Sequence, residues 1–116
     1  MEIHPSEKLL KELYDRFAHG NIEGVIAMCD DAMVYKVPGS IPTSGTYNNR
    51  TFGKLVDMTV EISKGTFRET PVDIIANDNH GIVLLIHSLE RNGKRIEYRT
   101  SHRWTIRNGK FVAWEE

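Results

Sequence analysis

Apolar residues in the first half of the chain recur every three or four positions, which is the spacing of amphipathic helices. This spacing predicts three helices. The first begins at an N-cap, Ser6, and ends at Gly20, which can adopt the left-handed conformation that closes a helix. A short second helix begins after Asn21, and the third runs from about residue 50 to residue 63.

A strand and a long loop are expected between the second and third helices. Asp30-Asp31 is typical of a helix end. Residues 32–37 then alternate in polarity, which predicts a strand with Lys36 on its less apolar face. Residues 38–49 are rich in Pro, Gly, Ser and Thr, a composition typical of a loop.

From residue 66 onward the apolar period changes to two, which is typical of strands. We predict four of them, at 67–76, 82–90, 94–107 and 110–116. Asn-Gly pairs at 92–93 and 108–109 are strong signals for tight hairpins. Strands joined in this way form an antiparallel meander, and the three helices must cover one of its faces. The chain is therefore predicted to be one α+β domain, residues 1–116.

The composition excludes several classes of protein. The chain has 116 residues, the size of one domain, and a formal net charge of −1. A general nucleic-acid binder needs a surplus of basic side chains, so nucleic acid is not an expected partner. No apolar run reaches the length of a membrane span, no basic-then-apolar leader opens the chain, and Cys29 is the single cysteine. We expect a soluble cytoplasmic protein with no membrane partner.

Strand alternation identifies the interior face of the predicted sheet. A two-residue turn at 92–93 places Arg91 opposite Lys94, and opposed residues share a face. The residues that then share the apolar face are Leu85, His87, Leu89, Ile96, Tyr98, Thr100, His102, Trp104 and Ile106. The register of the last strand stays open. A two-residue turn at 108–109 sends Phe111 inward, whereas a three-residue turn with a bulge sends Trp114 inward.

Two segments carry a resemblance to a known family. The stretch HGNIEGVIAMCDDAMVYKVPGSIPTSGTYNNR, residues 19–50, and the tail SHRWTIRNGKFVAWEE resemble the ketosteroid isomerase and polyketide cyclase (SnoaL-like) branch of the nuclear transport factor 2-like superfamily. The resemblance implies a cystatin-like fold, in which a cone-shaped, curved antiparallel sheet has three helices covering its concave face around a deep apolar pocket. It also implies that Trp114 faces this pocket. The fold hosts isomerases, cyclases, dehydratases and non-enzymes, so it does not choose a reaction.

The resemblance also supplies candidate catalytic residues. His102 stands where ketosteroid isomerases keep a buried acid, and Lys36 stands where they keep the general base. The oxyanion tyrosine of those enzymes falls on Leu13, one residue before Tyr14, so steroid isomerase activity is not carried over. We predict that His102 acts as acid or base and that Lys36 stabilises negative charge. The predicted pocket lining is Leu13, Tyr14, Phe17, Leu55, Val56, Leu85, His87, Tyr98, Thr100, Trp104 and Trp114.

Two classes of function stay open. One is an enzyme that transfers protons on a small, apolar carbonyl compound; the other is a non-catalytic module that binds a small hydrophobic ligand or pairs with itself. Histidines on an apolar face are also common as core residues that hydrogen-bond to their surroundings. We predict no cofactor and no metal site, since His87 and His102 have no carboxylates near them in sequence, although Glu116 could approach them in space.

A homodimer is expected. Leu84 and Ile86 point away from the predicted pocket, and all three helices are committed to the other face of the sheet. A second copy, packed on the convex face of the sheet, would cover these two side chains.

Overall fold

The computed structural model describes residues 3–116. In chain order its elements are α1 (Pro5–Ala18), α2 (Ile22–Ala27), β1 (Cys29–Val37), β2 (Gly45–Tyr47), α3 (Phe52–Ser63), β3 (Arg68–Ala76), β4 (His80–Arg91), β5 (Lys94–Arg107) and β6 (Lys110–Glu115). The α+β class and the order of the longer elements are confirmed. The short strand β2 lies inside the segment that was predicted to be a loop.

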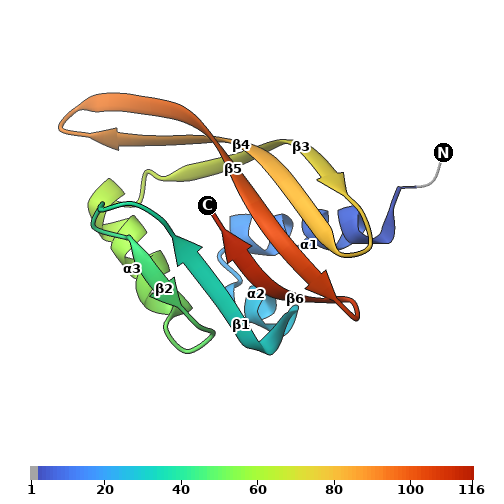
Figure 1. Cartoon of the computed structure of the whole chain (residues 1–116). Helices are drawn as coiled ribbons and strands as arrows, with labels where there is room; N and C mark the ends of the chain where they lie inside the picture. The colour runs from blue at the N-terminus through green and yellow to red at the C-terminus, as the bar shows by residue number, and fades with distance from the viewer. Residues whose placement is uncertain (1–2) are drawn as a thin grey trace.

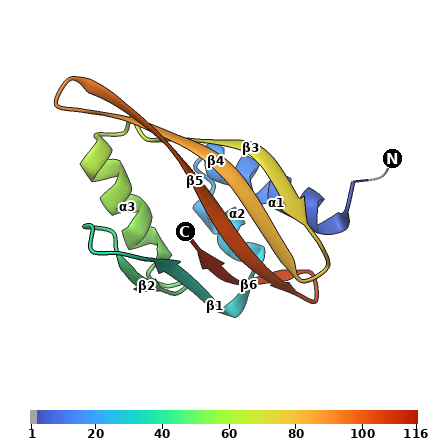
Figure 2. The same cartoon turned by 45° about the horizontal axis from the view of Figure 1, so that its top comes forward.

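The strands form one curved sheet in the order β2-β1-β6-β5-β4-β3 (Figure 1). Strands β1 and β6 are parallel, and every other neighbouring pair is antiparallel, so the sheet is mixed rather than purely antiparallel. Helix α1 packs against β3 and β4, α2 against β1, and α3 against β4. Figures 1 and 2 both show the C-terminus in the middle of the molecule, between α3 and the β4–β5 hairpin. The last residues of the chain therefore lie close to the interior.

Two helix boundaries differ from the prediction. The N-cap of α1 is His4, whose Nδ1 accepts a hydrogen bond from the Ser6 amide at 3.0 Å, and Pro5 occupies the first helical position. The predicted cap, Ser6, lies inside the helix and is buried. Strand β1 begins at Cys29, so Asp30 and Asp31 lie in the strand rather than at a helix end.

Both Asn-Gly turns have positive φ at each central residue: 54° and 74° at Asn92 and Gly93, and 51° and 73° at Asn108 and Gly109. These values are typical of two-residue hairpin turns. Of the two turns left open for the second hairpin, the structure has the two-residue turn, with Arg107 paired to Lys110.

A bulge after the second hairpin turn decides which residues of β6 face inward. Ile106 pairs with Phe111, but Thr105 pairs with Ala113 and Trp104 with Trp114, so one extra residue is inserted in β6. Because the bulge changes the alternation, Phe111 and Trp114 both lie in the interior. The two registers considered from the sequence each describe one part of this strand.

The core lies between the helices and the concave face of the sheet. Its fully buried side chains include Leu10, Met33, Tyr35, Leu85 and Phe111. Opposite this core, Ile82 and Leu84 are each 40% exposed on the outer face. Within residues 3–116, the helices are all too short or too polar to cross a membrane.

Candidate functional site

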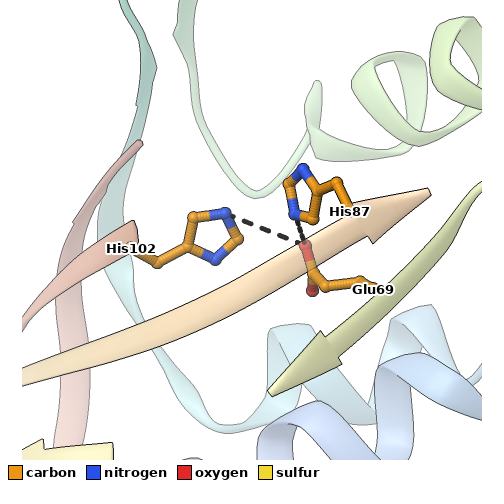
Figure 3. Close-up of side chains that lie close together, drawn as sticks. All are labelled: Glu69, His87 and His102. Atoms are coloured by element: carbon orange, nitrogen blue, oxygen red, sulfur yellow. Dashed lines mark hydrogen bonds and ion pairs between the residues drawn. The ribbon is translucent and has the colours of Figure 1, made fainter. Parts of the chain in front are cut away.

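Three neighbouring strands bring two histidines and a glutamate together inside the sheet. Glu69 comes from β3, His87 from β4 and His102 from β5. His87 Nε2 lies 2.8 Å from Glu69 Oε2, and His102 Nε2 lies 3.8 Å from the same oxygen. Figure 3 shows this carboxylate pointing between the two imidazoles. The side chains are 3%, 4% and 11% exposed for His87, His102 and Glu69, so water reaches them poorly.

A second carboxylate reaches the same place from the end of the chain. Glu116 Oε1 lies 3.5 Å from His102 Nε2 and 3.7 Å from His87 Nδ1. The Glu116 amide donates to the Lys36 carbonyl at 3.2 Å, which holds the backbone beside β1. The neighbouring His102 imidazole lowers the pKa of the Glu116 carboxyl, against the opposing effect of burial. Glu116 is also the more accessible carboxylate, with 26% of its side chain exposed.

A buried tyrosine on α1 holds the other side of the His102 ring. Tyr14 Oη lies 2.6 Å from His102 Nδ1 and accepts a hydrogen bond from Trp104 Nε1 at 3.0 Å. Burial raises the pKa of Tyr14 well above its ordinary value, and the charge of Glu69 raises it further. Tyr14 therefore stays a neutral phenol and can donate its proton to Nδ1. In that arrangement the imidazole carries its own proton on Nε2.

His102 Nε2 is buried and has no hydrogen-bond partner among residues 3–116. Buried polar atoms are nearly always paired, so this nitrogen is the candidate for contact with a ligand. The atom is aimed at the two carboxylates, which lie just beyond hydrogen-bond distance. These four side chains, Glu69, His87, His102 and Glu116, are called the His–Glu centre below.

Most of the predicted site residues lie on the interior side of the sheet, but only some of them contact the His–Glu centre. Tyr14, His87, His102, Trp104 and Trp114 form one connected aromatic cluster; the ring centres of His102 and Trp114 are 4.8 Å apart. Of the other predicted lining residues, three are buried in the general core, Leu13, Leu55 and Leu85, and three are half-buried, Phe17, Val56 and Thr100. Tyr98 contacts His87 and is 44% exposed, because this end of the β4–β5 hairpin extends beyond the core.

Lys36 does not join His102, which corrects the prediction that the two act together. Strand alternation turns Tyr35 into the core and Lys36 to the outer face, where it is exposed and pairs with Glu115 across the ladder. There it lines a shallow hollow of about 190 Å³. A second hollow, of about 630 Å³, lies on the same outer face near Asp30. Neither includes His87 or His102, so the deep apolar pocket stays a prediction.

The sequence carries a match to a known domain over almost its whole length. The profile of the SnoaL-like domain matches residues 10–114. The chain belongs to the SnoaL-like family. The SnoaL-like resemblance noted in residues 19–50 and in the tail is thereby confirmed. Among curated proteins, none matches this SnoaL-like chain by sequence.

Solved structures agree on the fold. A nuclear transport factor 2-like protein from Burkholderia pseudomallei has a TM-score of 0.86 at 19% identity, with 97% of this chain and 89% of that chain covered. Bal32a, from a soil-derived mobile gene cassette, has a TM-score of 0.86 at 17% identity, with 96% and 86% covered. TerC, co-crystallised with polyporic acid, has a TM-score of 0.84 at 20% identity, with 96% and 88% covered. At these identities the likeness shows the fold of the SnoaL-like chain and no more.

Glu69 is the one member of the centre that sequence reasoning missed. It lies directly opposite His87, but that pairing depends on the register between β3 and β4. The register shifts between Pro71 and Asp73, and a turn without an Asn-Gly pair joins the strands. A proline such as Pro71 is typical of an edge strand or a bulge, but the sequence carries no signal for the partner of Glu69.

Proposed function

We propose that this SnoaL-like protein catalyses proton transfer on a small, largely apolar carbonyl compound, in an isomerisation, an aldol-type cyclisation or a dehydration. The observation that carries the proposal is that a part-exposed carboxylate, Glu116, lies 3.5 Å from a buried imidazole nitrogen, His102 Nε2, that makes no hydrogen bond to residues 3–116. Enolisation requires a base at the carbon next to the carbonyl and a hydrogen-bond donor at the carbonyl oxygen, and here the two groups lie 3.5 Å apart.

In this mechanism Glu116 breaks the carbon–hydrogen bond next to the carbonyl and takes the proton. The electron pair moves onto the carbonyl oxygen, and the His102 Nε2–H group donates a hydrogen bond to the resulting enolate. In an isomerisation, Glu116 then returns the proton to a different carbon. In an aldol-type cyclisation, the enolate attacks a second carbonyl and the resulting alkoxide takes the proton from Glu116. In a dehydration, the enolate expels a β-hydroxyl group, which takes that proton and leaves as water. Tyr14, hydrogen-bonded at Nδ1, keeps the imidazole proton on Nε2.

The two carboxylates, Glu69 and Glu116, have different surroundings and therefore different roles in this mechanism. Glu69 is bound to His87 Nε2 at 2.8 Å, so it orients that ring and is not free to take a proton from a ligand. The ion-pair contacts of Glu116 within residues 3–116 are longer, 3.5 Å and 3.7 Å, and 26% of its side chain is exposed. The rings of Trp114 and Tyr98 border the same region and would contact an apolar ligand. The co-crystallisation of TerC with polyporic acid supports a small organic ligand on this fold.

Hydrogen–deuterium exchange tests the proposal without knowledge of the natural substrate. A panel of small ketones and 1,3-dicarbonyl compounds is incubated in D₂O with the protein, and loss of the α-proton signal is followed by NMR. We expect the protein to accelerate exchange for at least one compound. Glu116→Gln and His102→Gln should each lower the rate by about 10²-fold or more. Glu115→Gln is the matched control, because Glu115 is paired with Arg103 on the outer face.

Two results would overturn the proposal. One is exchange at the buffer rate for every compound, and the other is equal loss in the Glu115 and Glu116 variants. Tight binding of a panel compound without any exchange would instead favour the non-catalytic ligand-binding module.

A further inference from the structure

We propose that Glu69, His87 and His102 form a binding site for a divalent transition-metal ion, with Zn²⁺ as the ion to test. This proposal replaces the sequence-based prediction of no metal site, which did not include Glu69. Each residue offers one ligand atom, and these atoms all lie within 4.8 Å of one another. The three side chains come from three adjacent strands and converge on one point (Figure 3). A rigid sheet holds them there, rather than a loop.

The donor set matches what such an ion requires. Two imidazoles and one carboxylate are the protein ligands of many catalytic zinc sites, which leave a fourth position open. In a tetrahedral site with bonds of about 2.1 Å, ligand atoms lie about 3.4 Å apart. The separations from Glu69 Oε2 to His87 Nε2 and to His102 Nε2, 2.8 Å and 3.8 Å, lie on either side of that value. The third separation, between the two histidine nitrogens, is at most 4.8 Å, so a bound ion would have to draw the three ligand atoms toward this common spacing.

The environment of His102 Nε2 is a second observation that favours an ion at this place. Its Nε2 is buried and has no hydrogen-bond partner among residues 3–116, yet it points at the Glu69 carboxylate. A metal ion between these two groups would satisfy the atom that the protein leaves unpaired.

The outer nitrogen of each ring lies beside a phenol oxygen that could hold it in a metal site. His102 Nδ1 lies 2.6 Å from Tyr14 Oη, and His87 Nδ1 lies 3.2 Å from Tyr98 Oη. When Nε2 binds a metal, the ring proton would sit on Nδ1 and the phenol oxygen would accept it, which reverses the direction of the Tyr14–His102 hydrogen bond of the metal-free protein. Such hydrogen bonds fix the tautomer and the orientation of a ligating imidazole.

The charges also favour a cation. Glu69 and Glu116 bring two carboxylates into a largely buried place, and within the described part of the chain their ion-pair partners are imidazoles only, with no lysine or arginine. Buried carboxylates are costly unless a positive charge or a metal compensates them. An ion can enter on the side where Tyr98 and Glu116 reach solvent.

The inference shares residues with the proposed function and extends it at one point. A bound ion would take the place of the His102 N–H group in polarising the carbonyl oxygen, and Glu116 would remain the base. Metal binding and proton transfer are measured separately. A failure to bind metal leaves the metal-free reaction standing, and a failure of exchange leaves the metal site standing.

Isothermal titration of the EDTA-treated protein with ZnCl₂ tests the site. We expect one ion per chain, no comparable heat with MgCl₂, and a rise in Tm with Zn²⁺. Glu69→Gln and His87→Gln should each weaken binding at least about tenfold. His4→Ala is the matched control, because His4 pairs with Asp78 in an exposed position and offers the alternative surface site. With Co²⁺ in place of Zn²⁺, the visible absorption of a four-coordinate ion should appear and be absent in the His87 variant.

Three outcomes would overturn the inference: no binding of Zn²⁺ at micromolar protein, equal binding by the wild type and the Glu69 and His87 variants, or loss of binding in His4→Ala alone. Circular dichroism checks that each variant folds. Should Glu69→Gln fail to fold, Glu69→Asp replaces it, since it keeps the charge and withdraws the carboxylate by one methylene. Unchanged zinc affinity in a folded Glu69→Asp variant would also count against the site.

Discussion

Tyr14→Phe isolates the hydrogen bonds that connect helix α1 to the His–Glu centre. The substitution removes one oxygen atom and leaves the ring in place. That oxygen accepts from Trp104 Nε1 at 3.0 Å and lies 2.6 Å from His102 Nδ1, and all three residues are buried. Both partners therefore lose their hydrogen bond without gaining access to water.

The expected cost follows from those two orphaned groups. A buried donor or acceptor left without a partner costs about 1–3 kcal/mol. With two such groups and partial relaxation, we expect Tyr14→Phe to lower the free energy of unfolding by about 2–5 kcal/mol. Tyr47→Phe is the matched control. Its hydroxyl makes one hydrogen bond, to the Thr43 carbonyl at 2.7 Å, in a half-buried position. Its loss should cost about 0.5–1.5 kcal/mol.

Urea denaturation followed by far-UV circular dichroism measures both free energies. A double-mutant cycle with Trp104→Phe adds a second test. In the Trp104→Phe background there is no indole N–H that could lose its hydrogen-bond partner. The loss of unfolding free energy caused by Tyr14→Phe should therefore be smaller by about 1–3 kcal/mol. Equal costs for the Tyr14 and Tyr47 variants, or no coupling in the cycle, would refute the buried network described above.

Three further outcomes are expected. Gly81→Ala should destabilise the protein by about 1–3 kcal/mol, because an added Cβ would collide with the buried Leu10 side chain. Gly53→Ala in helix α3 meets open space and should stabilise the protein by about 0.5–1 kcal/mol. Equal urea midpoints for the two variants would contradict this pair of expectations. We propose that the exposed apolar side chains on the outer face of the sheet pack against a second copy of the chain. Sedimentation should then give the mass of a dimer for the wild type and of a monomer for Leu84→Lys. A monomer mass for the wild type at all micromolar concentrations would refute the dimer. Burial raises the pKa of the Cys29 thiol, so an aromatic disulfide reagent should react slowly with the folded protein at pH 8 and rapidly in urea. Equal rates in the two conditions would show that the thiol is accessible in the folded protein.

Several features of the fold could be predicted because neighbouring residues decide them. The hairpin at 92–93 is an example: Asn and Gly both accept positive φ, so the turn and the pairing of Arg91 with Lys94 follow from four adjacent residues. From that pairing, alternation alone places His87 and His102 on one face. Helix spacing likewise indicated the buried positions Leu10, Leu13 and Tyr14 on one side of α1.

Other features depend on contacts between distant residues. Strand β2 has only three residues and exists through its pairing with β1, which no local pattern indicates. The bulge that turns Trp114 inward is set by how β6 fits between β1 and β5. Lys36 was assigned by its resemblance to an isomerase position, yet alternation of its own strand turns it outward.

The His–Glu centre shows most clearly which features local sequence determines and which depend on tertiary packing. The sequence by itself determined that two histidines share the interior face, since a tight turn and a period of two are local properties of the backbone. Only the tertiary structure decided that Glu69 and Glu116 meet them and that Tyr14 bonds to His102. Those contacts depend on the β3–β4 register, the course of the C-terminus and the docking of α1. Such arrangements are set by the packing of the whole core, in which a shift of one residue turns a side chain to the opposite face.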